Sequence, residues 1–441
     1  MENGLTENLE ENNCKSLANM KVFKFGGASV KDAAAIKNIA AIIKTFGDDS
    51  LVIVISAMGK TTNALEKVVH AFYYKTGEAE TLLNEVKKFH FQILDELFDS
   101  KTHPIYQELH NTFVEIEWQI EDEPVGKFDF EYDQMVGIGE MLSTKIVSAY
   151  LNEVSCQNKW FDVRGLIRTD NTYRNAKVDW TVSTEQIQGE LASFLNAKKG
   201  SIAITQGFVG SSSENFTTTL GREGSDFTAA ILANILDAEE ITIWKDVEGM
   251  LNADPKYFDK TIKLNNISYL EAVELAYFGA SVIHPKTIKP LQNKGIPLQV
   301  KSFLNPGNKG SLIDQNSSAD SLIPSYIHKP NQILISIAAR DYSFITEDNL
   351  SAIYATFSKH GVSINIMQNS AISFSVCVDN EIPKINGLIA ELQSDYKVTY
   401  NTDLQLLTVR HYTEEIIEEL IAGKTIFLEQ KSRSTARFVV K

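Results

Sequence analysis

Short apolar runs alternate with segments of helical periodicity through the first three hundred residues of the chain. The run at 51–56, Leu-Val-Ile-Val-Ile-Ser, is rich in β-branched residues and lacks polar alternation, which is typical of a strand buried on both faces of a parallel sheet. Further strands are predicted at the run that ends in Phe25 and at 160–163, 201–205, 241–244 and 297–301. Helices are predicted at 31–39, 66–123 with a break near His103, 134–151, 227–236 and 270–278. This alternation predicts an α/β fold.

The pattern changes after 305–324, a stretch rich in Asn, Gly, Ser and Pro that predicts a boundary. A strand, a helix, two strands, a helix and a strand are predicted next, which is the ferredoxin-like βαββαβ order, at 333–339, 347–360, 362–367, 372–378, 385–393 and 397–400. The same order begins again at 404–409, 414–421, 425–429 and 437–440 and stops short of its second helix. Tandem modules of this kind, without catalytic residues, are more often binding or pairing modules than enzymes.

The composition narrows the class of protein. With 441 residues, 43% hydrophobic and 22% charged, the chain is expected to form two or three globular domains. Its net charge of −15 argues against nucleic acid or an anionic membrane as a partner, so any phosphate site is expected to be a local pocket. The longest apolar run, 51–58, is far shorter than the ~20 residues that span a bilayer.

Two further expectations concern location and the amino terminus. Cys14, Cys156 and Cys377 lack metal-ligand spacing and are too few for a disulfide framework, so reduced thiols and a cytoplasmic location are expected. Residues 1–19 are polar, show no apolar periodicity and carry no export signal, so a disordered tail is expected, with Met20 as the functional start.

A glycine turn is the first candidate for chemistry. Gly26 and Gly27 lie between the first strand and the first helical pattern, and such a turn exposes N–H groups where a phosphate binds. Lys24 directly precedes the turn, although an ordinary tight turn explains the glycines equally well. A Walker A loop is excluded because Val54 stands where it needs glycine, and a dinucleotide fingerprint is excluded by Leu142.

The stretch 217–226, Thr-Thr-Thr-Leu-Gly-Arg-Glu-Gly-Ser-Asp, is the second candidate. Ser225 or Asp226 is a suitable helix N-cap, while Arg222 between two glycines is typical of a loop that binds a carboxylate or a phosphate. Both interpretations can hold together. The histidines show no metal-ligand spacing, and His284 is expected to be satisfied by backbone, so no protein metal site is predicted.

Four motifs together closely resemble those of aspartate kinases: 24–30, 139–143, 217–222 and 224–226. With the C-terminal repeat, the resemblance covers nearly the whole chain from Met20. It implies an amino-acid-kinase fold, a three-layer αβα sandwich with a mostly parallel sheet, over 20–304. It further implies a linker at 305–330 and ACT domains at 331–402 and 403–441, the second of them truncated.

The resemblance also implies a reaction and its site residues. The family transfers the γ-phosphoryl of ATP to the side-chain carboxylate of L-aspartate, giving 4-phospho-L-aspartate and ADP in the first step of lysine, methionine and threonine biosynthesis. Mg²⁺ is expected to be held mainly through the nucleotide. The implied catalytic residues are Lys24, Asp226, Gly26 and Gly27, and the implied aspartate contacts are Ser56, Thr62, Glu140, Arg222 and Ser225. The implied nucleotide contacts are Lys24, Phe25, Gly26, Gly27, Lys245, Asp246, Leu251, Lys256 and Ser281.

Regulation is implied by the ACT modules. The resemblance implies a homodimer through the ACT domains and feedback by lysine or threonine at Ser363, Asn365, Met367 and Gln368. No dinucleotide-binding domain follows, so a kinase without homoserine dehydrogenase activity is expected.

Four positions depart from the family's pattern. Glu223 stands for a glycine, which matters if that residue needs a positive φ. Ser281 stands for a common lysine, Leu251 for a tyrosine near the adenine, and Lys256 for an arginine.

Two alternatives stay open. Another amino-acid kinase would act on glutamate, N-acetylglutamate, carbamate or UMP, and the double ACT tail argues against it. A non-catalytic amino-acid sensor would bind ATP without turnover, and the joint presence of Lys24, Arg222 and Asp226 argues against that.

Overall fold

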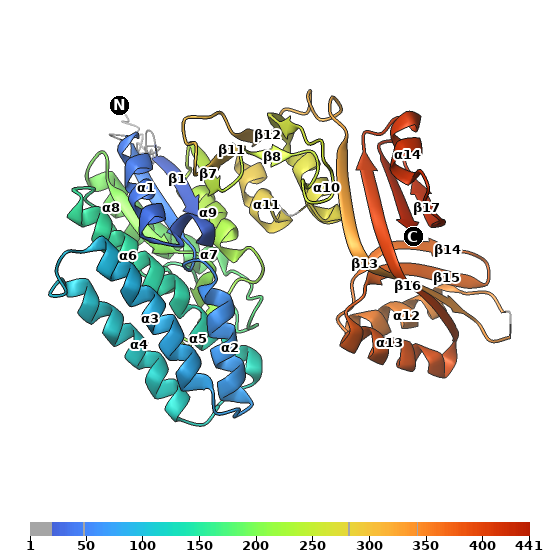
Figure 1. Ribbon diagram of the computed structural model, residues 1–441, viewed down its shortest axis with the longest axis horizontal. Coiled ribbons are helices and arrows are strands. Elements are labelled where there is room, and N and C mark those ends of the chain that lie inside the picture. The colour runs from blue at the N-terminus through green and yellow to red at the C-terminus, as the bar shows by residue number, and fades with distance from the viewer. Residues whose placement is uncertain (1–19, 47–48, 281–282, 342) are drawn as a thin grey trace, which may run out of the picture. The chain divides into compact units, whose positions relative to one another are not determined.

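The structure is a computed structural model that describes residues 20–46, 49–280, 283–341 and 343–441 (Figure 1). The predicted disordered tail, 1–19, and the predicted nucleotide contact Ser281 lie outside these residues. The chain divides into two compact units, Met1–Met250 with Ile283–Gln315 and Leu251–Val282 with Asn316–Lys441.

A mostly parallel sheet forms the centre of the first unit. Its strands lie in the order β12-β11-β7-β1-β2-β4-β3, and the chain order shows the crossovers expected of an α/β fold. The pairs from β11 to β3 are parallel, and β12 pairs antiparallel with β11. The strands are β1 (Met20–Phe25), β2 (Ser50–Ile55), β3 (Lys159–Phe161), β4 (Ile202–Gln206), β7 (Glu240–Lys245), β11 (Leu298–Ser302) and β12 (Ser311–Asp314).

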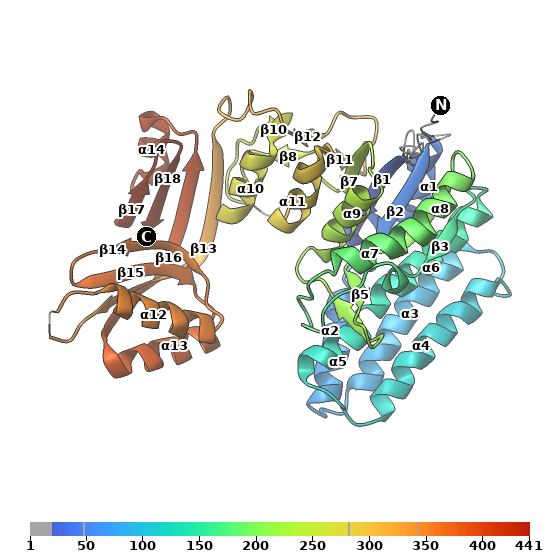
Figure 2. The same ribbon diagram turned by 180° about the vertical axis from the view of Figure 1, so that it is seen from behind.

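Helices cover both faces of this sheet (Figures 1 and 2). Leu51, Ile53 and Ile55 of β2 share one core with α1, α3 and α6, and α9 packs against β1, β2 and β7. The helices are α1 (Ala33–Lys44), α2 (Thr61–Tyr73), α3 (Ala79–Leu97), α4 (Pro104–Glu121), α5 (Phe128–Val136), α6 (Ile138–Glu153), α7 (Trp180–Gln186), α8 (Ser193–Ala197), α9 (Gly224–Ile235) and α11 (Pro285–Lys294). The predicted α/β fold is confirmed.

Short elements connect these layers. A hairpin of β5 (Val209–Ser211) and β6 (Thr217–Thr219) precedes α9. The remaining short elements of this unit are the 3-10 helices Gly27–Val30 and Val163–Gly165 and the π-helix Ile187–Ala192. Further along the chain come the short strands β8 (Met250–Leu251), β9 (Lys263–Leu264) and β10 (Asn266–Ser268), of which β9 and β10 belong to the second unit.

The second unit is built on a six-stranded sheet in the order β14-β15-β13-β16-β18-β17. Neighbouring strands are antiparallel throughout. Its elements are α10 (Tyr269–Phe278), β13 (Ser325–Ala338), α12 (Glu347–Lys359), β14 (Ile364–Asn369), β15 (Ser373–Asp379), α13 (Ile382–Asp395), β16 (Lys397–Arg410), α14 (Glu414–Ile421), β17 (Ile426–Lys431) and β18 (Thr435–Val440).

Two long strands, β13 and β16, are shared by both βαββαβ modules. The second half of β13 and the first half of β16 belong to the first module, together with α12 and α13. The remaining half of β16 continues into α14, β17 and β18, and residues 325–329 of β13 take the place of the missing fourth strand. The second module is therefore completed by a segment that precedes the first. The range predicted as a linker, 305–330, contains β12 and these residues of β13.

Candidate active site

A pocket of about 580 Å³ lies at the carboxyl ends of β1, β2 and β7, where open α/β sheets bind ligands. Segments far apart in the sequence line it together. Among the residues predicted from the sequence, the lining includes Lys24, Gly27, Ser56, Thr62, Glu140, Arg222, Ser225, Asp226 and Lys245.

The side chains of Lys24 and Asp226 form a buried ion pair in this pocket. Lys24 Nζ lies 2.6 Å from Asp226 Oδ1, and the two residues are 8% and 2% exposed. Lys245 Nζ approaches the other carboxylate oxygen at 3.9 Å. Two ammonium groups thus face one carboxylate, which leaves positive charge available for a phosphate group.

The glycine turn after β1 is closed by backbone hydrogen bonds. Gly27 opens a short 3-10 helix, and its carbonyl accepts a hydrogen bond of 3.0 Å from Gly59 N–H. A Cβ at Gly27 would lie 2.8 Å from the carbonyl oxygen of Gly59 and 2.9 Å from that of Ala57. Only glycine lets the two loops meet this closely.

Phe25 does not line this pocket. Its ring is fully buried in the core and stacks on Trp244, with ring centroids 6.0 Å apart. The alternation of side chains along β1 places Lys24 toward the pocket and turns its neighbour away.

Glu140 is a buried carboxyl group within the same pocket. It lies in the first turn of α6, is 3% exposed, and its Oε2 has no hydrogen-bond partner among the residues that the structure describes. Burial raises its pKa to about 8, and hydrogen bonding to the Ala57 backbone and the charge of Lys24 only partly oppose this rise. A buried acid with one free oxygen is suited to pair with a ligand cation.

The helix α9 begins differently from the prediction. Its N-cap is Glu223, so the expectation of Ser225 or Asp226 as N-cap was wrong. Gly221 and Glu223 both adopt positive φ, 80° and 54°, and this tight turn starts the helix earlier than the side-chain pattern indicates. The side chains of Ser225 and Asp226 are therefore free of the capping role and line the pocket.

Arg174 and Asp133 also contribute to this site, although neither was predicted from the sequence. Arg174 lines the pocket, and its guanidinium lies 4.2 Å from the ring centroid of Tyr132. Its backbone N–H donates to the buried Asp133, which also accepts from the N–H and the hydroxyl of Thr219. Burial raises the pKa of Asp133 to about 6 against these hydrogen bonds. No local motif links these residues, because only the fold brings them together.

Other predicted nucleotide contacts are not among the residues that line this pocket. Asp246 is exposed and does not line the pocket. Leu251 and Lys256 belong to the second unit, where Lys256 is exposed and its N–H donates to Asp254 Oδ1 at 2.9 Å.

The predicted effector residues lie on and beside β14, the edge strand of the second unit. Ser363, Met367 and Gln368 are exposed. Asn365 is engaged within the unit, because its amide donates to Gln332 at 2.8 Å and its carbonyl accepts from Lys329 at 2.8 Å.

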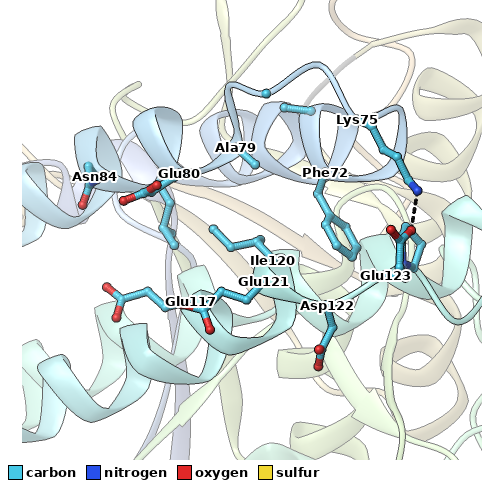
Figure 3. A pocket seen from close by; sticks show the side chains of 14 residues that line it. Phe72, Lys75, Ala79, Glu80, Asn84, Glu117, Ile120, Glu121, Asp122 and Glu123 are labelled. Atoms are coloured by element: carbon cyan, nitrogen blue, oxygen red, sulfur yellow. Dashed lines mark ion pairs between the residues drawn. The ribbon is translucent and has the colours of Figure 1, made fainter.

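A separate hollow of about 670 Å³ between α2, α3 and α4 is acidic (Figure 3). Lys75 is paired with Glu123 there, and the other labelled charged side chains are Glu80, Glu117, Glu121 and Asp122. Such a surface repels a polyphosphate, so it does not compete as a nucleotide site.

Comparison with known proteins assigns a class first. Residues 19–302 match the amino acid kinase family, so this part of the chain has the kinase fold of that class. In the part of the chain that the structure describes, no helix is long and apolar enough to cross a membrane.

Individual relatives show which group within this family the chain resembles. The chain is 31% identical over 418 residues to the lysine-sensitive aspartokinase 3 of Escherichia coli, covering 93% of this chain and 91% of the relative. Two crystal structures of E. coli aspartokinase III superpose on this chain. Each is 27% identical to it, and each match covers 96% of this chain and 96% of the other chain. Their TM-scores are 0.82 for the complex with aspartate and ADP, called the R-state, and 0.79 for the complex with lysine and aspartate, called the T-state. The chain therefore belongs to the aspartokinases of the amino acid kinase family.

Proposed function

We propose that the protein transfers the γ-phosphoryl group of ATP to the side-chain carboxylate of L-aspartate, forming 4-phospho-L-aspartate and ADP. The observation that carries this proposal is the buried Lys24–Asp226 pair beside the glycine turn, in a pocket that also holds Arg222 and Glu140. Membership of the aspartokinases gives the reaction class.

The pocket fits a phosphoryl transfer that needs no general base. The acceptor carboxylate is ionised at neutral pH, so its oxygen attacks the γ-phosphorus directly while the bond to the β-phosphate oxygen breaks and ADP leaves. Lys24 is suited to stabilise the charge on the transferring group, and Asp226 holds its ammonium in place. The backbone N–H groups of Gly26 and Gly27 are the proposed additional donors to phosphate.

Aspartate recognition is assigned to polar groups of different charge in one pocket. Arg222 is the proposed partner of the α-carboxylate. Glu140, whose Oε2 has no hydrogen-bond partner in the part of the chain that the structure describes, is the proposed partner of the α-ammonium. Hydroxyl groups of Ser56, Thr62 and Ser225 complete the proposed set.

The nucleotide and its metal ion are proposed to share the pocket. Lys245 is a proposed phosphate contact, because its ammonium group lies beside the carboxylate of Asp226. For Mg²⁺ the described residues offer no cluster of three or more His, Cys, Asp or Glu side chains, so ATP phosphates and water are the fitting ligands. When bound, the ion would neutralise phosphate charge.

Regulation, assembly and location are the finer parts of the proposal. The second unit has the βαββαβ arrangement of paired modules, and a relative of known structure was crystallised with lysine and aspartate. We infer an amino-acid effector near β14 and a homodimer through this unit. Cys156 and Cys377 are buried free thiols, which supports a reducing cytoplasm as the location.

The test is ATP-dependent acyl phosphate formation trapped with hydroxylamine. L-aspartate, L-glutamate and N-acetyl-L-glutamate are offered separately, each with and without lysine or threonine. Product formed with L-aspartate but not with the other two acceptors supports the proposal. A decrease in product when lysine or threonine is added identifies that amino acid as the effector. Intact ATP binding with no product from any acceptor would instead favour the amino-acid sensor.

A further inference from the structure

A pocket of about 460 Å³ in the second unit uses none of the residues assigned above. It is lined by α10, the end of β16 and the β17–β18 hairpin, and three basic side chains contribute to it: Arg410, Lys431 and Arg437. Their charges are compensated to different degrees.

The charge of Arg410 is compensated by carboxylates. Its Nη2 and Nε donate to the two oxygens of Glu271 at 2.6 and 2.8 Å, and its Nη1 donates to Glu274 at 2.8 Å. Lys431 has a partner too, because its Nζ lies 3.1 Å from Glu429. Carboxylates of the protein therefore already balance these two positive charges, so neither cation is assigned to bind an added anion.

Arg437 has no such charge partner among the described residues. The residue lines the pocket, is 8% exposed, and its Nε has no hydrogen-bond partner within the described part of the chain. Its guanidinium lies 4.9 Å from the ring centroid of Phe278, and no ion pair joins it to a carboxylate among the residues that the structure describes. A buried unpaired charge is costly, and a bound anion would offset that cost.

We propose that this pocket binds a small anion, with a carboxylate or phosphate group held by the Arg437 guanidinium. A guanidinium matches either group with two parallel hydrogen bonds. The hydroxyls of Ser434 and Thr435 line the same pocket and add donors, and Phe278 closes one side as an apolar wall. The proposal concerns the second unit alone and does not depend on the kinase reaction.

The test uses the full chain with inorganic phosphate or acetate as the probe, at constant ionic strength. Thermal melting is followed for the wild type, Arg437→Met, and Arg433→Met, which removes an exposed arginine from the same hairpin. A saturable rise in Tm with one probe, retained in Arg433→Met, supports the proposal and identifies the anion class. In Arg437→Met the apparent Kd is expected to increase about 10-fold or more.

Two further measurements keep the outcome decisive. The experiment is repeated in Lys24→Met, where the rise must persist, since phosphate bound in the kinase pocket would be lost there. If Arg437→Met fails to fold, wild-type crystals soaked in selenate must show an anomalous selenium peak within hydrogen-bond distance of Arg437. No rise with either probe, an equal rise in Arg437→Met, or no such peak would overturn the proposal.

Discussion

Lys24 Nζ and Asp226 Oδ1 lie 2.6 Å apart, although one residue is in the first strand and the other in a helix much later in the chain. Lys24 is flanked on both sides by parallel strands, opposite Val54 of β2 and Ile243 of β7. The strand that carries the ammonium group is thus held rigidly, while α9 brings the carboxylate to it. A fixed cation of this kind needs little reorganisation when charge develops on a phosphoryl group.

Replacement of Lys24 by Met is expected to lower kcat by about 10²–10³-fold, because one preorganised donor to the transferring group is lost. Acyl hydroxamate formation measures the rate. Lys21→Met is the matched control, because Lys21 lies on the same strand but pairs with Asp49 and Glu240 away from the pocket. A rate within about threefold of the wild type in Lys24→Met would refute the assigned role.

Replacement of Glu140 by Gln is expected to change how stability depends on pH. The folded-state pKa of about 8 lies above the ordinary value of 4.5, so folding favours the protonated form. The stability contribution is complete below the unfolded pKa and is lost as pH rises through the folded pKa. Between about pH 5 and 9 the unfolding free energy of the wild type should therefore fall relative to that of Glu140→Gln.

The same substitution tests aspartate binding. A ligand ammonium favours the charged carboxylate, so the wild-type KM for aspartate should decrease as pH rises toward 8, and Glu140→Gln should lose that dependence. Glu153→Gln, in the same helix with a side chain that is 59% exposed, serves as the control. Identical pH profiles for wild type and Glu140→Gln would contradict the assignment.

The two glycines after β1 are expected to tolerate alanine differently. A Cβ at Gly27 meets two carbonyl oxygens at 2.8 and 2.9 Å, whereas one at Gly26 meets only Lys24 Nζ, at the longer distance of 3.4 Å. Gly27→Ala should cost about 1–3 kcal/mol in urea unfolding and weaken ATP binding, because two backbone loops must separate. Gly26→Ala, whose φ of −79° suits any residue, should retain stability. Equal losses in both variants would show that the crowding at Gly27 is not decisive.

Glu223 is expected to be strained at its position. Its φ is 54°, in the left-handed region, and its buried Oε2 finds no hydrogen-bond partner in the described residues. Glu223→Gly should raise the unfolding free energy by about 1 kcal/mol by relieving the backbone. Glu223→Ala removes the carboxylate but keeps the Cβ, so it separates the two effects in a thermal melt. If alanine stabilises as much as glycine, the buried carboxylate rather than the backbone is the cause.

Much of the kinase fold could be predicted because its strands are continuous apolar runs. Predictions from local sequence were wrong where contacts between distant parts of the chain determine the structure. The helix predicted at 134–151 is divided at Gly137 into α5 and α6, where an added Cβ would lie 3.3 Å from the side chains of both Val209 and Thr217. The break expected between 397–400 and 404–409 is absent, since both runs pair with the single strand β13.

The candidate site shows the same limit. Lys24 and the glycine turn lie within one motif and could be found from the sequence, as could Arg222 beside its glycines. Asp133 and Arg174 could not, because their link is a hydrogen bond between a helix and a distant loop. His284 was predicted to be satisfied by backbone, and its Nδ1 does accept from Lys286 N–H at 3.1 Å as the N-cap of α11.

The buried pair of Arg410 and Glu271 is expected to be important for the stability of the second unit. Burial raises the pKa of Glu271, but the hydrogen bonds and charge of Arg410 outweigh it, so the pKa lies below its ordinary value. Glu271→Gln should cost about 3–5 kcal/mol, because it leaves the buried guanidinium without its bidentate partner. The loss should shrink as pH falls below 4.5, because the unfolded carboxyl then binds a proton while the folded one is still ionised.

Glu274 provides the matched control for this pair. It contacts the same guanidinium at 2.8 Å, but its side chain is 39% exposed, so Glu274→Gln should cost less than about 1 kcal/mol. Urea unfolding, monitored by hydrogen exchange in α10 and β16, measures the unfolding free energy of both variants. The double variant Glu271→Gln with Arg410→Met should recover part of the loss, since it removes the orphaned charge as well. If both single variants cost the same, solvent screening rather than burial governs the pair.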